Sequence, residues 1–504
     1  MTYKLPSFYF RNLGFDDYLM IRQMKSLIAH NYLGIYGSLT LVKGIVFPTF
    51  LYIIRILNLS YSSVLTFLYI MSSLFFLRCI KKLINNHKIL ILIYIVLLFN
   101  PLSYSSDLFQ RLYRNSLQHI ELLLFLSFII NIICTEKTKI INYVFLGFTI
   151  SLMFLTREDN MWTLLILLIV FIYKVYRKKN LKNIFVNFLP IFILIICLNI
   201  ISYINYQYYG IYSYNELNQS EFKQFYVKVL KIKSENKINK VAINKSDLIL
   251  LVNNVDRMKI TTKDIEKFYE KCKDSNGEIN NGNMIWYLRN YIYRKYQFKN
   301  AKEANKFFYE INKEIEKKIK EGKIKTEFVI PNLYINNPTI NEIKEIPKLL
   351  IDAIIYTSSY QNIKSFDRNS MYQIENINYD DNIRSYYIIY NDYHYTENII
   401  KKNVLIFEII RIIYKYFTII LSFFSVIIFF KNIKIKDKLN LITIIIMLCY
   451  FIILLGIVYT EATAFHAIRY FYLGNIYILQ NIFIILNLWR LYGNRCNNFN
   501  ALFK

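Results

Sequence analysis

Two adjacent carboxylates, Asp16 and Asp17, stand where a helix is expected to begin. Met20, Met24 and Leu27 share one face of that helix, so its apolar side packs against other residues. Capping is the commonest use of Asp at a helix start. A helix N-terminus also stabilises an ionised carboxylate, which would keep it ready to accept a hydroxyl proton. The pair is therefore either a helix cap or a general base.

Basic residues in the first quarter of the chain have types and spacings that suit a phosphate group. Lys43 stands in the step Lys43-Gly44 to Pro48, directly before an apolar helix. It is either an anchor whose ammonium reaches the membrane surface or a contact for an anionic headgroup. Arg111 and Arg114 are three positions apart, so on a helix they would share a face and could clamp one phosphate.

The segment 156–162 carries three successive ionisable residues, Arg157, Glu158 and Asp159, between two apolar blocks. The turn is too short to form a solvated domain. Its charges are therefore either an exposed hairpin tip or groups that face a cavity. We favour the cavity, because ionisable residues at a membrane edge tend to be functional.

Further candidates for the same cleft lie in two other predicted turns. Asp107 stands in the loop before Arg111, and Glu461 and Arg469 flank the last turn of the chain. His466 lies in that last turn but receives no role, because a lone histidine at a helix start is more often structural than a ligand or base. The sequence contains no HExxH, GxxxxGK[ST], GxGxxG or GxSxG motif, which leaves metalloprotease, P-loop and serine-hydrolase functions without support.

The apolar and aromatic residues, 55% of the 504, come in blocks long enough to span a bilayer. This pattern predicts an all-α polytopic membrane protein. Nine blocks with basic flanks lie near residues 61–80, 88–104, 118–134, 139–156, 160–176, 183–204, 403–430, 439–460 and 466–488.

Lys and Arg in the short connections give the orientation, because short basic loops stay on the cytoplasmic side. We expect a multi-pass protein of the plasma (inner) membrane whose active face lies outside the cytoplasm. The polar segments then fall on that outer face: residues 1–60, the loop 107–114, the turn 156–160, an insert at 205–402 and the turn 460–465.

The same spans divide the chain into a first external loop with juxtamembrane helices and the acidic pair (1–60), helices one to six (61–204), the extracytoplasmic insert (205–402) and a C-terminal part with three helices and a short tail (403–504). The insert is expected to be an α or α+β domain. Its clearest element is an amphipathic helix that begins after Asn300, with Glu303 at the capping-box position, and stops at Gly322. Glu314 and Lys318 are placed to pair on its surface.

The charge balance, 62 basic against 35 acidic residues, gives a net charge of +27. We do not expect a nucleic-acid partner, because many of the cations flank hydrophobic blocks, where they set topology. The six cysteines are scattered without metal-ligand or redox spacing, so neither a disulfide framework nor a zinc site is predicted. Without an internal repeat, an inverted-repeat transporter has no support from symmetry.

With these residues in view, the chain resembles the GT-C membrane glycosyltransferases, which take a sugar from a polyprenyl-phosphate carrier. The resemblance rests on the pair Asp16-Asp17, the step Lys43-Gly44 to Pro48, and a many-helix body with charged external turns. It implies a GT-C-like bundle. The chain departs from the family by lacking a helix before the acidic pair. Either a first helix lies upstream of the given start, which we favour, or the short N-terminal segment crosses the membrane together with the first hairpin.

The resemblance implies inverting transfer from a polyprenyl-phosphate-linked sugar to a hydroxyl of a glycan, lipid or protein. Asp16 would be the base, and Asp17 would hold the acceptor or a divalent cation, which some members use. No other cofactor is implied, and the metal requirement is open. The cations that would stabilise the departing phosphate are Lys43, Arg111, Arg114, Arg157 and Arg469.

Two alternatives remain from the sequence: a transporter or flippase of lipid-linked glycans, and an inactive relative in which Asp16 only caps a helix. Charges that converge on one external cleft would favour the enzyme. A polar pathway through the bilayer would favour transport, and scattered charges would favour the inactive relative.

Overall fold

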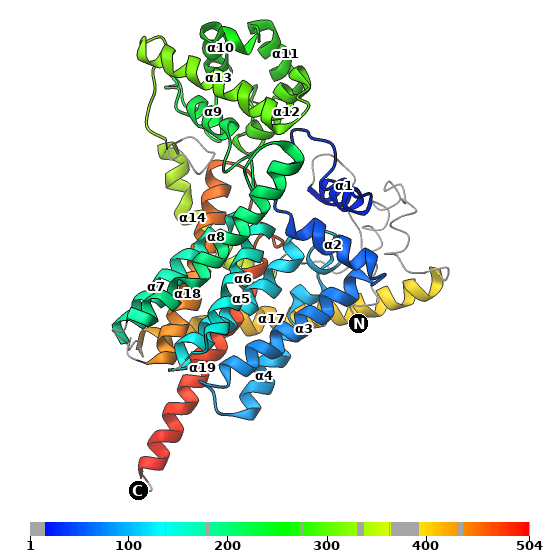
Figure 1. Cartoon of the computed structure of the whole chain (residues 1–504). Helices are drawn as coiled ribbons and strands as arrows, with labels where there is room; N and C mark the ends of the chain where they lie inside the picture. The colour runs from blue at the N-terminus through cyan, green and yellow to red at the C-terminus, as the bar shows by residue number, and fades with distance from the viewer. Residues whose placement is uncertain are drawn as a thin grey trace.

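The computed structural model describes residues 16–136, 138–177, 181–274, 276–329, 337–361, 363, 393–431 and 437–502. In these ranges every named element is a helix, and isolated bridges pair Ile232 with Thr326 and Val241 with Asn280. Figure 1 shows a bundle of long helices with a cluster of shorter helices at one end. A helical bundle is expected in a bilayer, because each helix pairs its own backbone groups.

Within the described ranges, seven helical segments are long and apolar enough to cross a membrane, which is the pattern of a multi-pass membrane protein. Many of their large apolar side chains are exposed, as on a surface that faces lipid. The helices that supply the seven segments are α3 (Tyr61–Ile80), α4 (His87–Leu98) with η2 (Pro101–Tyr104), α5 (Asn115–Cys134), η4 (Glu158–Met161) with α7 (Trp162–Arg177), α8 (Leu181–Tyr209), α17 (Tyr393–Lys431) and α18 (Lys438–Thr463).

Two of the nine predicted spans are not among these seven. The span at 139–156 is helix α6 (Ile140–Thr156), whose 17 residues reach about 26 Å at 1.5 Å per residue, less than the roughly 30 Å of a bilayer core. The span at 466–488 is wrong at its start, because α19 (Gly474–Leu502) begins later. Residues 466–473 form a loop instead, and its backbone bonds to side chains of α5 and α18.

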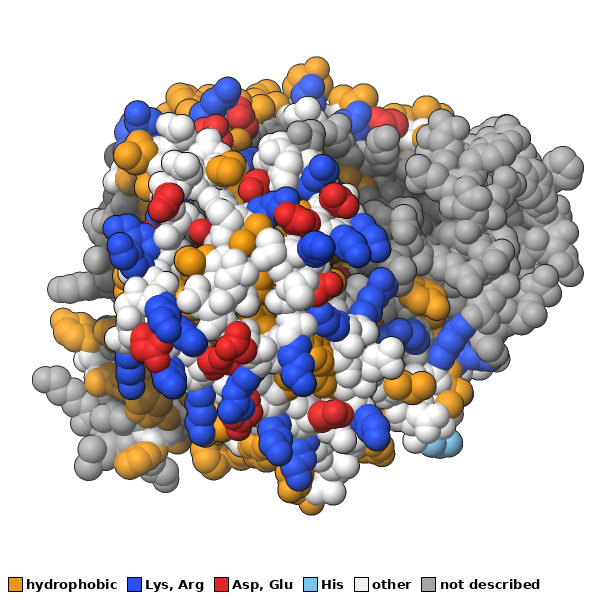
Figure 2. All heavy atoms as spheres, turned by 90° about the horizontal axis from the view of Figure 1, so that it is seen from above, with side chains coloured by type: hydrophobic (Ala, Val, Ile, Leu, Met, Phe, Trp, Pro, Cys, Tyr) orange, Lys and Arg blue, Asp and Glu red, His pale blue; other side chains and the backbone are white. Residues whose placement is uncertain are grey.

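A separate helical head sits at one end of the bundle (Figure 1). Its core is rich in aromatic residues, including Phe222, Phe225 and Phe308, and it also buries Tyr32 and Tyr36 from the segment before Lys43. Figure 2 shows Lys, Arg, Asp and Glu side chains interspersed over the described part of the face seen from above. The helices of the head are α9 (Glu221–Leu230), α10 (Lys245–Asn254), α11 (Thr262–Cys272), α12 (Asn281–Tyr296) and α13 (Ala301–Lys320).

The amphipathic helix predicted in the insert is α13. The Asn300 side chain accepts a hydrogen bond of 2.9 Å from the backbone N–H of Glu303, and Gly322 ends the helix with φ +74°. The expected surface pair does not form. Glu314 instead accepts hydrogen bonds of 3.1 Å from the backbone N–H groups of Asp256 and Arg257, which ties α13 to the neighbouring turn.

The predicted insert 205–402 contains two structurally different parts. The core of the head takes in residues between Tyr209 and Val329. Helix α14 (Ile340–Ser358) packs along α18 instead, and its buried Ala353 belongs to the core of the bundle.

Short helices α1 (Asp16–Ile28) and α2 (Val46–Ile56) pack against each other at the head end of the bundle (Figure 1). The segment between them is fixed by the fully buried Arg289 of α12. Its guanidinium donates to the Ser38 carbonyl at 2.6 Å and pairs with Glu216, and Tyr36 donates to the same carboxylate at 2.7 Å. The Tyr293 ring centre lies 4.4 Å from the guanidinium, and because Tyr36 gives its one proton to Glu216, the Tyr293 hydroxyl donates to Tyr36 at 2.8 Å. The head therefore holds the segment that carries Lys43.

We predict that Arg289→Met lowers the thermal unfolding temperature of the purified protein in detergent. The change leaves Glu216 buried without its cation, and breaking a buried ion pair costs about 3–5 kcal/mol. Arg294→Met on the exposed side of the same helix is the matched control and should change little. An unfolding temperature unchanged by Arg289→Met would contradict this account of how the head is attached.

Candidate functional site

The two carboxylates of the acidic pair lie in different environments. Asp17 is fully buried, and Arg111 donates to its two oxygens from Nε and Nη2, each at 2.7 Å. The side chain of Asp16 is 27% exposed, and its Oδ2 lies 3.0 Å from Lys43 Nζ and 3.3 Å from Arg114 Nη2. Both residues are in the first turn of α1, where the helix N-terminus also favours negative charge. Asp16 alone of the two has an oxygen that a small molecule can approach.

Arg111 and Arg114 do not share a helix face, so the predicted two-arginine clamp is wrong. Arg111 precedes the helix, between the π-helical turn η3 (Ser106–Gln110) and α5, and turns to Asp17. Arg114 is the N-cap residue of α5 and donates from Nη1 to Glu158 at 3.2 Å. The chain leaves the helical path between the two arginines, so each meets a different carboxylate.

Lys43 is turned inward, although a snorkelling anchor was an alternative from the sequence. Its side chain is 10% exposed, its ammonium pairs with Asp16, and it lies 4.5 Å from the ring centre of Trp286 in the head. Lys43 can take this position because residue 44 is a glycine. A Cβ on residue 44 would lie 1.8 Å from the carbonyl oxygen of Leu155 at the end of α6. Only glycine allows the loop to approach α6 so closely.

The charges of the 156–162 turn divide between the interior and the surface. Glu158 faces the interior, where it accepts hydrogen bonds of 3.2 Å from Arg114 and 3.0 Å from the Asn215 amide. Arg157 is paired with the exposed Asp159 at 2.6 Å and donates to the Asn115 amide oxygen at 2.7 Å. Part of the turn therefore faces the interior, and part is a hairpin tip.

Together these contacts form one group, which we call the charge cluster. It contains four cations and four carboxylates, each cation paired with at least one carboxylate. The formal charge of the cluster is therefore zero. Its members are Lys43, Arg111, Arg114, Arg157, Asp16, Asp17, Glu158 and Asp159.

The cluster keeps Asp16 ionised although the site is largely buried. Burial raises the pKa of Asp16, but the nearby charges of Lys43, Arg114 and Arg157 lower it by more, so that its pKa falls to about 2. Burial likewise lowers the pKa of Lys43, an effect that Asp16 opposes. The pKa of Arg114 is raised, because Glu158 and Asp16 outweigh the effect of its burial.

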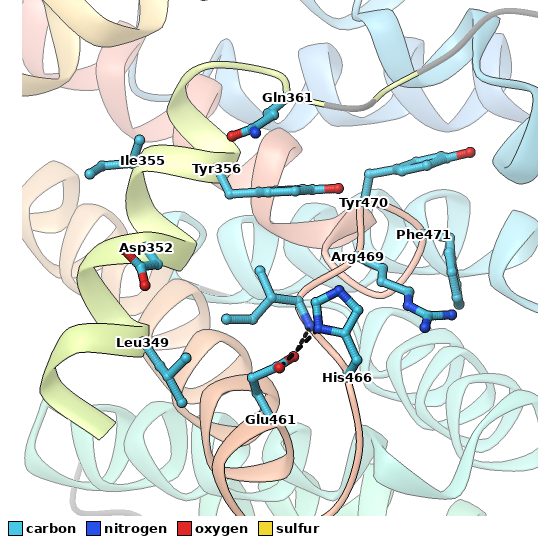
Figure 3. Close-up of a pocket in the computed structure, with 11 residues that line it drawn as sticks. Leu349, Asp352, Ile355, Tyr356, Gln361, Glu461, His466, Arg469, Tyr470 and Phe471 are labelled. Carbon is cyan, nitrogen blue, oxygen red and sulfur yellow. Dashed lines mark hydrogen bonds and ion pairs between the residues drawn. The ribbon is translucent and has the colours of Figure 1, made fainter. Parts of the chain in front are cut away.

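Glu461 and Arg469 lie outside the charge cluster, at a neighbouring cavity of about 560 Å³ (Figure 3). Glu461 accepts hydrogen bonds from the backbone N–H groups of Ala467, at 2.6 Å, and Ile468, at 2.8 Å, and lies 2.9 Å from His466 Nδ1. Arg469 is exposed, and in the described part of the chain its guanidinium forms no ion pair. We call the cavity of about 560 Å³ that these residues line the His466 cavity.

The His466 cavity adjoins the charge cluster through its wall residue Phe471. The Phe471 ring lies 5.8 Å from the Arg111 guanidinium, and its carbonyl accepts a hydrogen bond of 2.8 Å from Asn115, which also binds Arg157. Sequence reasoning assigned no role to His466 or Asn115. For His466, the one signal in the sequence was its short spacing from Glu461 across the end of a helix.

Other predicted features lie partly outside the described structure. Asp107 falls within η3, but its side chain is not among those described. The described residues contain no group of three or more His, Cys, Asp or Glu side chains that could hold a metal ion. The five described cysteines are free thiols.

Comparison with protein-family models, with curated proteins and with solved structures gave no match to this chain. The site is therefore interpreted from its own geometry.

We predict that Gly44→Ala displaces Lys43 from Asp16 and lowers the thermal unfolding temperature. The added Cβ overlaps the backbone of Leu155, which cannot move without shifting α6. Gly37→Ala in the same segment is the control, since its Cβ would approach no atom closer than 4.0 Å. Equal unfolding temperatures for the two variants would show that the close approach to α6 is unimportant.

We also predict that Lys43→Met raises the pKa of Asp16, because burial then opposes ionisation with one cation fewer. In the wild type the pKa is lowered from 3.8 to about 2, so the ion pairs of Asp16 add stability above pH 3.8 and lose it as the pH falls through 2. Carboxyl ¹³C NMR of aspartate-labelled protein, assigned with Asp16→Asn, should show no titration of Asp16 between pH 4 and 8.

In Lys43→Met the midpoint of the Asp16 titration should rise toward pH 4, whereas the exposed substitution Lys81→Met should leave that midpoint unchanged. A wild-type Asp16 that titrates above pH 4 would contradict the ion-pair assignment.

Proposed function

We propose that the chain is an integral membrane glycosyltransferase of the bacterial plasma membrane, of the GT-C type. It would move a sugar from a polyprenyl-phosphate carrier to an acceptor hydroxyl, with inversion, on the face that carries the head. One observation carries the proposal: the partly exposed, ionised Asp16 stands among buried cations at the head end of a membrane bundle.

Asp16 is our choice for the base. Asp17 is fully buried with both oxygens bonded to Arg111, so it would hold Arg111 and the start of α1 in place. In the transfer, the acceptor oxygen attacks the anomeric carbon and gives its proton to Asp16. The bond between that carbon and the phosphate oxygen breaks, and polyprenyl phosphate leaves with the electron pair.

Lys43 and Arg114 are the cations best placed to receive the leaving phosphate, with Arg157 beside them. Each is largely buried, so its charge would act strongly on an anion in the site. A phosphate that takes over these two cations would replace the carboxylate of Asp16 as their partner. Donor binding would thereby weaken the ion pairs that hold the pKa of Asp16 low and make it a stronger base.

The distribution of charges supports an enzyme over a transporter. The charged residues of the predicted cleft gather at the head end of the bundle, and buried Glu121, within α5, bonds to Thr156 of the same region at 2.5 Å. A transporter would be expected to place such groups near the bilayer midplane. Their convergence equally argues against an inactive relative in which Asp16 is only a cap.

We predict that Asp16→Asn reduces sugar transfer by roughly 10²–10⁴-fold, the range lost with a general base. The change is isosteric and keeps most of the capping ability. The measurement is transfer of labelled sugar from polyprenyl-phosphate-linked donors in membranes that contain the full-length chain. Asp256→Asn, on the surface of the head, is the control and should retain full activity.

Transfer by folded Asp16→Asn at the wild-type rate would remove Asp16 from the role of base. If the wild type consumes none of the polyprenyl-phosphate-linked donors, that result would contradict the proposed function itself.

A further inference from the structure

The His466 cavity has a composition that the phosphate-transfer chemistry of the charge cluster leaves unexplained. It lies where α14 faces the end of α18 and the loop that follows it. Its volume, about 560 Å³, is in the range of small-molecule sites. Figure 3 shows His466 between Glu461 and Arg469, with the rings of Tyr356 and Tyr470 across the space from them.

His466 is held as a directed hydrogen-bonding group. Its Nδ1 lies 2.9 Å from Glu461, and Glu461 is itself fixed by two backbone N–H groups. The imidazole is nevertheless 63% exposed. A carboxylate that engages one ring nitrogen fixes the ring's orientation and leaves Nε2 for another partner. The pair therefore presents a positioned nitrogen to whatever enters the cavity.

The charges of the cavity argue against a phosphate as its ligand. Arg469 is opposed there by two carboxylates, Asp352 and Glu461, so the lining does not carry an excess of positive charge. A lipid tail is also disfavoured, because histidine, arginine, carboxylate and the amide of Gln361 lie along the walls. Carboxylates and amides accept hydrogen bonds from hydroxyl groups, and arginine donates to hydroxyl oxygens.

Aromatic rings beside such groups complete a surface for a sugar. Tyr356 and Tyr470 supply ring faces, on which the apolar C–H face of a sugar ring can lie. The Phe471 ring lines the same cavity and lies 5.8 Å from the Arg111 guanidinium of the charge cluster. A bound sugar would therefore lie next to the groups that we propose for transfer.

We infer that the His466 cavity binds a saccharide ring, with His466, held by Glu461, bonding to its hydroxyl groups and Tyr356 and Tyr470 covering its apolar face. This saccharide subsite rests on the proposed function in that it supplies one of the sugars of the transfer. That sugar belongs either to a free glycan acceptor or to the lipid-linked donor. Binding can be measured without turnover, so the inference can be tested separately from catalysis.

The test is saturation-transfer NMR on the full-length protein in detergent micelles, with neutral methyl glycosides and disaccharides in one arm and polyprenyl-phosphate-linked sugars in the other. We expect saturable transfer to sugar ring protons. His466→Ala and Tyr470→Ala should each weaken binding about tenfold, as expected for one lost hydrogen bond or stacking contact. The controls, exposed His87→Ala and Tyr176→Ala, should bind as the wild type does.

Tyr470→Phe keeps the ring and should keep binding, which guards against a variant that simply misfolds. Binding in the free-glycan arm assigns the cavity to the acceptor, and binding confined to the lipid-linked arm assigns it to the donor sugar; both support the saccharide subsite. Two results of this binding experiment would overturn it: no saturable binding in either arm, or binding that His466→Ala and Tyr470→Ala leave unchanged.

The inference and the proposed function can fail separately. Saccharide binding by a wild-type protein that consumes no donor would retain the subsite and remove the transferase. Transfer by His466→Ala with an unchanged KM for donor and acceptor would retain the transferase and remove the subsite.

Discussion

The buried ion pair between Arg111 and Asp17 is the interaction on which the arrangement of the site depends. Both side chains are almost completely removed from solvent, and two hydrogen bonds of 2.7 Å join them. Such a pair adds little net stability, because desolvation of two charges costs several kcal/mol, but loss of one partner leaves a buried charge and is severely destabilising. The pair therefore fixes the first turn of α1 against the chain just before α5. This places Asp16, the preceding residue, beside Lys43 and Arg114.

The equal numbers of cations and carboxylates explain how so many charges, most of them largely buried, can gather in one place. A cluster with an excess of either sign would pay for desolvation without compensation. In the charge cluster each guanidinium or ammonium meets a carboxylate. Neutrality also has a consequence for ligands: an anion must displace a carboxylate to bind. Asp16 is the member best suited to be displaced, because it is partly exposed and has no bidentate arginine.

The head acts on the site through the loop that carries Lys43. Arg289 and Glu216 fix one part of that loop, and Trp286 covers the Lys43 ammonium. On the other side, Gly44 lies directly on the backbone of α6. The loop is thus enclosed between head and bundle, and the ammonium of Lys43 has little freedom to leave Asp16. This rigidity suits a site in which charged groups act by position.

The sequence by itself determined the class of the fold and most of the residues that meet in the site. Block length identified seven of the membrane helices, and capping and periodicity identified α13, because these features depend on near neighbours in the chain. Asp16, Lys43, Arg114, Arg157 and Glu158 were found as unusual polar residues beside apolar blocks.

Only the tertiary structure decided which charges pair with which. The different exposure of Asp16 and Asp17, the separation of Arg111 from Arg114 and the placement of α14 in the bundle all depend on contacts between segments far apart in sequence. Asn215 and Trp286 reach the cluster from the insert, and no local pattern marks them. The physical reason is that desolvation and pairing energies are set by the whole surroundings of a group, whereas helix formation is set largely within a few turns of the chain.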